Sequence, residues 1–388
     1  MLNRRLLRTK AVQALYASQL SAEANRLLGI DQIDLAFAPD LNSMEYQDRP
    51  KLTRMKGMAV VTLDELIKDG KISLDNEAPS EVTKVSKRVF EAYNRQTIGD
   101  REKMVRRVLN ETELIHVDFV RVLSLIMELA YQAQIDRQRT YEDPDAPFPK
   151  ESGLDSNRVI EVLKQNEGLQ EEIIRNGINW SNDMAVVRKT YKEAMKKDEK
   201  YIAYCKEKTH TEEEDQLLVQ HILRQIILKH EVPLNFLEQR DLYWDDHSEL
   251  IRSLAIKTLK SADSAETFQL SPLTKDWEED RAFVEELFKI VIEEGDQYDR
   301  YLDEQLKNWE LERIALVDLI IIKTALAELI HFPGIPVKVT INEFIEIAKR
   351  YSTPKSGKFV NGVLDVLSVK LANEGIIRKS GRGLIDNK

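Results

Sequence analysis

The chain has 388 residues, of which 42% are hydrophobic and 32% are charged. This length is enough for two or three domains with a sizeable buried core. The chain has only 14 glycines and 11 prolines, about half the usual share, which favours a helix-rich protein over sandwiches, barrels or long disordered linkers. The net charge of −10, taken as a total, argues against nucleic-acid binding.

The single cysteine, Cys205, cannot form a disulfide within the chain, which suits a reducing compartment such as the cytoplasm. No apolar run approaches the roughly 20 residues that a membrane-spanning helix needs. The basic N-terminus lacks the apolar segment and the cleavage site of a secretory signal. We therefore expect a cytoplasmic protein without membrane contact.

The charge is distributed very unevenly along the chain. Residues 1–20 carry +4, residues 347–364 carry +4 and residues 377–388 carry +3. These basic segments together carry +11, so the rest of the chain carries −21. If the segments meet in space, they form a patch that binds a phosphate backbone. The alternative is that they are two ordinary basic helix ends and a solvated tail.

Helical periodicity recurs along the N-terminal half. A first helix is predicted over residues 3–21, with arginines one turn apart on one face and apolar residues on another. Residues 29–57 are predicted to be irregular with short helices, and residues 71–80 to be a linker. Residues 117–134 are apolar enough for a largely buried helix, and the proline-rich residues 140–153 are predicted to be a loop.

An internal repeat marks the middle of the chain. Residues 215–244 align without gaps with residues 280–309, and the two segments end at Trp244 and Trp309. A fainter copy ends at Trp180. Each unit is predicted to be a helix, a short helix, a tryptophan and a further helix. The tryptophans either pack the core at helix junctions, which we favour, or stack on bases.

The C-terminal third has the clearest pattern. Residues 310–332 are apolar on nearly all sides, as expected of a central helix. Thr340 and Glu343 form a predicted capping box that opens the next helix. A last helix is predicted from residues 355–356 to a stop at Gly375.

Catalytic and cofactor motifs are missing from the sequence. The histidines and Cys205 do not have zinc-ligand spacing, and there is no nucleophile elbow and no glycine-rich nucleotide loop. The many Asp and Glu pairs are expected to be solvated charges on helical faces. We therefore expect a binding protein that is not an enzyme and needs no metal or cofactor.

Two passages resemble the transcription antitermination factor NusB family. Residues 335–349 and 356–365 match the long family motif I-P-x-K-V-x-I-N-E-x-[IV]-E-[LI]-A-K followed by S-x-K-F-V-N-G-V-L-D. Residues 4–16 (RRLLRTKAVQALY) resemble the arginine-rich first helix of the family. The resemblance implies an all-α fold of two packed helical bundles, here with a large helical region between the two matching passages.

The resemblance also implies a function and a domain organisation. It implies binding of single-stranded boxA-type RNA from nascent ribosomal RNA leaders, jointly with a small-subunit ribosomal protein (NusE), which supports elongation by RNA polymerase. The expected domains are a first helix (1–20), a helical insertion (21–275), a C-terminal core (276–375) and a basic tail (376–388). The positions that match the RNA-binding residues of the family are Arg4, Arg5, Arg8, Tyr16, Lys355, Ser356, Lys358, Phe359 and Asn361.

These residue types suit a division of labour at one RNA site. The arginines and Lys358 are expected to contact phosphates, and Tyr16 or Phe359 to stack on an unpaired base. Burial in the core is the alternative for Phe359. By the same resemblance, Asp318 is expected to face the protein partner. The family often has a further arginine where Leu6 stands and a histidine where Gly357 stands.

Two other functions are compatible with the sequence. NusB-like domains also precede some ribosomal RNA cytosine methyltransferases, which would make this chain part of an enzyme. The second alternative is a helical adaptor whose tryptophan repeats bind protein and which does not bind RNA.

Overall fold

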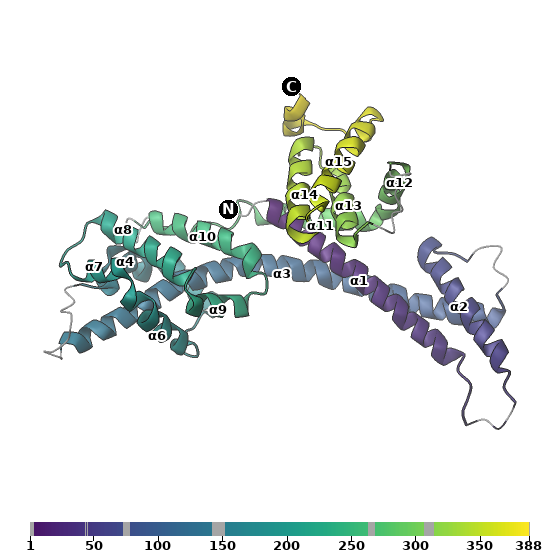
Figure 1. Cartoon of the computed structure of the whole chain (residues 1–388), viewed down its shortest axis with the longest axis horizontal. Helices are drawn as coiled ribbons and strands as arrows, with labels where there is room; N and C mark the ends of the chain where they lie inside the picture. Colours follow the sequence, from purple (N-terminus) through teal and green to yellow (C-terminus); the bar gives the residue numbers. More distant parts are fainter. Residues whose placement is uncertain are drawn as a thin grey trace. The chain divides into compact units, whose positions relative to one another are not determined.

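The structure is a computed structural model that describes residues 4–42, 44, 46–72, 78–141, 152–262, 268–305 and 314–387. The regular elements within these ranges are all helices (Figure 1). This confirms the predicted all-α fold class. None of the described helices has both the length and the apolar character needed to cross a membrane.

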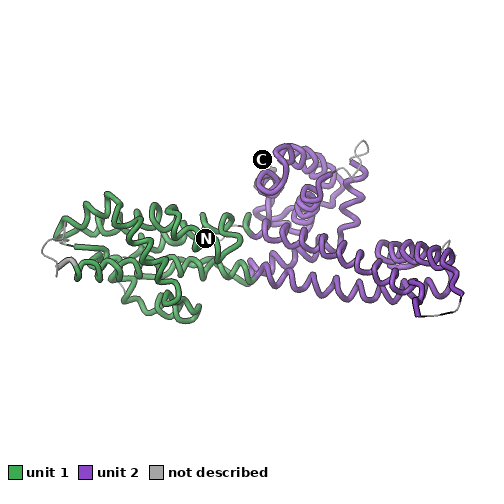
Figure 2. The backbone as a smooth tube through the Cα atoms, turned by 60° about the horizontal axis from the view of Figure 1, so that its bottom comes forward, with its two compact units in different colours: residues 1–6, 110–278 green, residues 7–109, 279–388 purple. Residues whose placement is uncertain are grey.

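The chain forms two compact units (Figure 2). The first unit contains Met1–Leu6 and Asn110–Glu278, and the second contains Leu7–Leu109 and Glu279–Lys388. Two long helices, α1 (Arg4–Ala36) and α3 (Ser80–Tyr141), contribute residues to both units.

The other helices each belong to one unit. The first unit contains η1 (Leu154–Ser156), α4 (Arg158–Gln165), α5 (Glu167–Arg175), α6 (Met184–Glu193), η2 (Met195–Lys197), α7 (Glu199–Cys205), α8 (Glu212–His221), η3 (Ile222–Ile227), α9 (Glu231–Arg240) and α10 (Trp244–Lys260). The second unit contains α2 (Arg49–Asp69), α11 (Trp277–Glu293, which begins at the boundary), α12 (Gly295–Gln305), α13 (Leu316–His331), α14 (Val337–Tyr351), α15 (Ser356–Asn373) and η5 (Gly381–Asn387).

The first helix is longer than the sequence pattern predicts. Instead of ending near Ser21, α1 continues to Ala36. Its buried positions continue at helical spacing through Asn25, Gly29 and Ile33, so the same face stays packed beyond the predicted end. Exposed leucines off this face (Leu27, Leu28 and Leu35) and the internal Gly29 obscure the helical period of the extension.

The prediction of an irregular segment over residues 29–57 is largely wrong. The non-helical part lies between α1 and Asp48, and α2 follows at once. The Asp48 carboxylate accepts a hydrogen bond from the backbone N–H of Lys51 at 3.0 Å and so caps α2. Gly70 ends α2 in the left-handed conformation, with φ of 68°, and donates its N–H to the carbonyl of Leu66.

Helices α1, α2 and the start of α3 pack side by side as a three-helix hairpin around a small apolar core. Ile33, Phe37, Met55, Ala59, Leu63, Val82 and Val89 form this core. A β-carbon on Gly29 would lie 3.0 Å from Val89 and 3.2 Å from Leu63. The missing side chain at this position therefore lets α1 approach both neighbouring helices closely.

The C-terminal half of the second unit is built around α13, as the sequence predicts. Its apolar residues are almost fully buried, and the helix contacts α12, α14 and α15. The predicted capping box is wrong, because α14 already begins at Val337 with Pro336 as its N-cap. Thr340 lies inside the first turn and is fully buried. The left-handed Gly375 follows α15, with φ of 70°, as predicted.

The first unit has an extended core of its own. The apolar segment of α3 lies in this core with most of its large side chains fully buried, which confirms the buried helix predicted over residues 117–134. Trp180 and Trp244 are each only 5% exposed, as core packing requires. Trp244 opens α10 at a helix junction. Trp309 lies outside the described residues.

A buried carboxylate in this core predicts a pH effect on stability. Asp118 forms an ion pair with Arg121, yet its burial raises its pKa from 3.8 to about 6. The folded state therefore binds more protons than the unfolded state between about pH 4 and pH 6. The stabilisation by protonated Asp118 is complete below its unfolded pKa and is lost as the pH rises through about 6.

We expect Asp118→Asn to be more stable than the unmodified chain at pH 7 by roughly 2 kcal/mol, because the amide keeps an acceptor for Arg121 without a buried charge. Urea unfolding followed by circular dichroism at pH 5 and pH 7 measures this. The unmodified chain should gain stability between pH 7 and pH 5 relative to the variant. Equal pH dependence in the two proteins would rule out Asp118 as the titrating group.

Candidate nucleic-acid interface

The α14–α15 loop, in which we include the first turn of α15 up to Phe359, presents two lysines to solvent. α14 ends at Tyr351, and Lys355 is the N-cap of α15. Lys355 and Lys358 are both exposed. In the part of the chain that the structure describes, neither side chain has a carboxylate within ion-pair distance. The loop therefore offers two uncompensated positive charges, which a phosphate backbone can use.

Ser356 fixes this loop to the central helix. Its hydroxyl donates to the Asp318 carboxylate at 2.7 Å and accepts from the backbone N–H of Thr353 at 3.2 Å. Ser356 is 2% exposed and Asp318 is 5% exposed. Because both groups are buried, their hydrogen bond holds the two lysines in a defined position.

Gly357 allows close packing at the start of α15. A β-carbon at this position would lie 2.8 Å from Cγ of Lys349 on α14. Lys349 in turn binds Glu346 through its ammonium group at 2.7 Å. The histidine that the family often has here would therefore displace the stem of Lys349, which gives a physical reason for the glycine.

The remaining predicted residues of α15 are less accessible than the lysines. Phe359 and Asn361 are both partly buried. The side-chain amide of Asn361 donates to Asp365, one turn further along, at 2.9 Å. Phe359 keeps part of its surface in contact with solvent, so both of the roles predicted for it, packing and stacking, are compatible with its position.

The predicted residues of α1 fall in different environments. Arg4 is partly buried and Arg5 is exposed, and both belong to the first unit. In the second unit, Tyr16 is 37% exposed and presents part of its ring to solvent. Arg8 is only 3% exposed, so it does not present its guanidinium at the surface.

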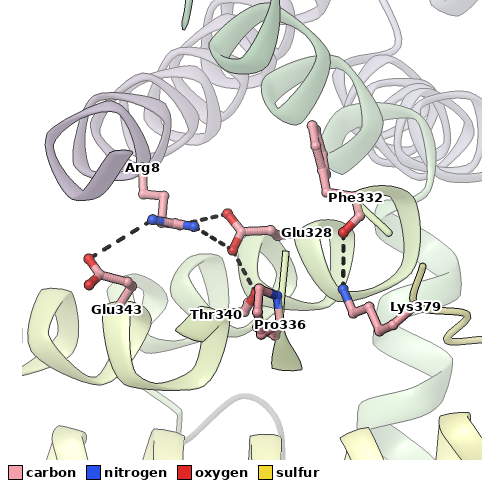
Figure 3. Close-up of polar contacts among 7 residues, drawn as sticks. All are labelled: Arg8, Glu328, Phe332, Pro336, Thr340, Glu343 and Lys379. Carbon is pink, nitrogen blue, oxygen red and sulfur yellow. Dashed lines mark hydrogen bonds and ion pairs between the residues drawn. The ribbon is translucent and has the colours of Figure 1, made fainter. Parts of the chain in front are cut away.

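Arg8 is the centre of a buried polar network instead (Figure 3). Its guanidinium donates to both carboxylate oxygens of Glu328, at 2.6 and 2.8 Å. Thr340 donates its hydroxyl to the same carboxylate at 2.7 Å, and Glu343 lies 3.9 Å from Arg8. The bidentate pair therefore joins α1 to α13 and α14. Its role in this structure is to position helices.

Sequence patterns did not reveal Glu328 and Thr340 as partners of Arg8. Glu328 is 0% exposed. The one available signal is the carboxylate of Glu328 within the largely apolar residues 320–330, which read IIIKTALAELI. A buried carboxylate needs a cationic partner, but the pattern does not say where in the chain that partner lies.

The two anchors lie at opposite ends of α13. Asp318 holds the α14–α15 loop near its start, and Glu328 holds α1 near its end. Ten residues separate them, or about 15 Å along the helix axis. Arg8 and Tyr16 of α1 and the predicted residues of the loop therefore belong to one framework within the second unit, but Arg8 and Asp318 lie inside it rather than on its surface.

The C-terminal basic segment packs on the end of α13. Lys379 donates its ammonium group to the carbonyl of Phe332 at 3.1 Å (Figure 3). Burial lowers its pKa from 10.5 to about 8. The backbone N–H of Ser380 bonds to the carbonyl of Pro333 at 3.0 Å. These contacts give the first part of the tail a structural role, whereas Arg382 is exposed.

Comparisons with known proteins identify the family. The NusB family model matches residues 249–368. The transcription antitermination protein NusB of Koribacter versatilis is 41% identical over 101 residues, which cover 26% of this chain and 69% of that protein. The chain belongs to the NusB family. This confirms the resemblance found in the sequence motif, and the matched residues include the α14–α15 loop.

Two further relatives support the same assignment. The NusB protein of Salinibacter ruber is 45% identical over 105 residues, covering 27% of this chain and 66% of that protein. The NusB protein of Chloroherpeton thalassium is 44% identical over 104 residues, covering 27% of this chain and 49% of that protein. The chain thus spans between about half and two thirds of the relatives' length. No solved structure matches the chain.

Proposed function

We propose that this NusB-family protein is an RNA-binding transcription antitermination factor. It binds a boxA-type single-stranded RNA through the α14–α15 loop, jointly with a small-subunit ribosomal protein, and supports elongation by RNA polymerase through that complex. The observation that carries the proposal is the pair of exposed lysines, Lys355 and Lys358, on a loop fixed by the buried Ser356–Asp318 hydrogen bond.

The arrangement suits a flexible polyanion. Two uncompensated cations on a rigid support contact phosphates without a large loss of conformational entropy. Tyr16 and Phe359, each with exposed ring surface, supply the stacking surfaces that single-stranded bases use. Arg8 and Asp318 contribute by holding α1 and the loop on α13, and they do not contact RNA themselves.

The test is binding of a boxA-like RNA to Lys355→Ala/Lys358→Ala across a series of salt concentrations. We expect weaker binding and a salt dependence whose log–log slope is smaller in magnitude by about 1.4, since each phosphate contact on a single strand contributes about 0.7. Filter binding or fluorescence anisotropy measures both quantities. Circular dichroism checks that the variant is folded.

Lys192→Ala/Lys200→Ala is the matched control. Both lysines are exposed on the first unit, so the net charge changes equally while the second unit stays unmodified. Equal slopes for the loop variant and the unmodified chain would refute the assignment of the site. Addition of the purified ribosomal protein tests joint recognition: a gain in RNA affinity supports it, and no gain counts against it.

A further inference from the structure

Helix α2 and the first part of α3 present a group of exposed cations outside the basic segments found in the sequence. In α2, residues 49–63 contain four cations and no acid. One of them, Lys56, forms an ion pair with Asp34 at 2.7 Å. The other three, Arg49, Lys51 and Arg54, are exposed, and none has a carboxylate partner among the described residues.

Helix α3 adds a row of cations. Lys84, Lys87, Arg88 and Arg95 are all exposed, and their spacing places them on one side of the helix. None of the four has a carboxylate partner in the described ranges. The acids of residues 80–95 are Glu81 and Glu91, so this stretch keeps a net charge of +2.

Several acids of the hairpin are used in internal contacts. Asp64 accepts two hydrogen bonds from Arg26, at 2.7 and 2.9 Å. Asp100 accepts from Ser21 at 2.9 Å and from Asn25 at 3.1 Å. These hydrogen bonds lower the pKa of Asp100. These internal contacts neutralise or fix Asp64 and Asp100, whereas Glu81 and Glu91 are exposed on α3 beside its cations.

The basic parts of α2 and α3 are neighbours. The Ser86 hydroxyl of α3 donates to the carbonyl of Ala59 in α2 at 3.0 Å, in a buried contact. Val82 and Val89 of α3 pack in the same core as Met55. The two helices therefore run side by side (Figure 1), and we name their exposed cations together the hairpin basic surface. Its residues are Arg49, Lys51, Arg54, Lys84, Lys87, Arg88 and Arg95.

The character of this surface favours RNA over a membrane. A helix that lies in a membrane interface buries an apolar face among the lipids. In the first part of α3, the apolar face of Val82 and Val89 is already buried in the hairpin core, and the opposite side is charged. Exposed cations without carboxylate partners among the described residues suit a hydrated polyanion, whose binding is driven by counterion release.

We propose that the hairpin basic surface is a second RNA-binding site, which contacts the phosphate backbone without sequence preference. It would take RNA that continues beyond the boxA-type segment, and in this sense it rests on the proposed function. The residues involved lie outside the part of the chain that the family model matches, residues 249–368. The hairpin therefore adds an RNA contact that the matched NusB region does not contain.

The test compares two RNAs on the full-length chain. One is a short boxA-like oligonucleotide, and the other carries about 20 further nucleotides of mixed sequence, longer than a typical single-strand binding site. We expect the longer RNA to bind the unmodified chain more tightly and with a steeper salt dependence. In the variant Arg54→Gln/Lys87→Gln/Arg88→Gln, the log–log salt slope for the longer RNA should be smaller in magnitude by about 2. Binding of the short RNA should not change.

A matched control and a second probe make the result decisive. Lys192→Gln/Lys197→Gln/Lys200→Gln removes three exposed charges from the first unit and should keep the length effect. The loop variant Lys355→Ala/Lys358→Ala should bind both RNAs more weakly, yet it should still bind the longer RNA more tightly than the short one. Failure of the proposed function at the loop can therefore be told apart from failure of the second site on the hairpin. No gain with length in the unmodified chain, or an equal gain in the hairpin variant, overturns the proposal. Binding to phosphatidylserine vesicles without the length effect also overturns it.

Discussion

Replacement of Arg8 by methionine should lower the free energy of unfolding of the second unit by about 3–5 kcal/mol, because it leaves a buried carboxylate without its cationic partner. Glu328 is fully buried and receives both guanidinium hydrogen bonds of Arg8. Among the residues that the structure describes, the Thr340 hydroxyl would be the one donor left to it. Urea unfolding followed by circular dichroism measures the loss.

The double variant Arg8→Met/Glu328→Met should recover most of this stability. Two methionines have volumes close to those of the ion pair, and replacement of a buried pair by apolar residues is often neutral or stabilising. The adjacent ring of Phe283, whose centroid lies 5.8 Å from the guanidinium carbon, offers an apolar contact for the methionine at position 8. A double variant as unstable as Arg8→Met would show that the cost lies elsewhere.

The double variant also separates the two roles considered for Arg8. If the arginine only positions α1, RNA affinity and its salt dependence should match those of the unmodified chain once stability is restored. If it contacts a phosphate, the slope should fall by about 0.7 even in the stable double variant. Arg8 is 3% exposed and its guanidinium donates to both carboxylate oxygens of Glu328. We therefore expect the salt slope of RNA binding to be unchanged.

The helical class and the central helix follow from local properties of the sequence. Low glycine and proline content and a helical period are visible in any window of the chain. The buried face of α13 follows in the same way, because its residues are apolar on all sides. The position of α15 follows from the break after Tyr351 and from the left-handed Gly375.

Features that depend on distant contacts do not follow from the sequence pattern. Thr340 has the sequence pattern of a helix cap, but its hydroxyl binds Glu328 on another helix, so the helix begins earlier. Arg8 has the pattern of an exposed cation, but its partner lies 320 residues further along the chain. Asp318 likewise faces Ser356, 38 residues away. A charge pattern indicates how many cations a segment has, and only tertiary packing decides which of them reach solvent.

Substitution of Trp180 by alanine should cost the first unit about 3–5 kcal/mol, as expected when a large buried side chain is removed from a core. The Trp180 side chain is 5% exposed. Its indole N–H donates to the Ser124 hydroxyl at 2.9 Å, and its ring lies 5.3 Å from that of Phe236. Thermal unfolding should show a decrease of the midpoint by several degrees for a unit of this size.

The same residue tests whether the tryptophans stack on RNA bases. Trp180 also lines a cavity of about 550 Å³ together with Tyr131 and Lys164, which is where an unpaired base would have to lie. Trp180→Phe keeps an aromatic face and loses the hydrogen bond to Ser124, at about 1 kcal/mol. If the ring only packs the core, both variants should bind RNA like the unmodified chain below their unfolding temperatures. If Trp180 stacks on a base, Trp180→Ala should lose about 1–3 kcal/mol of RNA binding free energy, whereas Trp180→Phe should keep it. Because Trp180 is only 5% exposed, we expect the core-packing result.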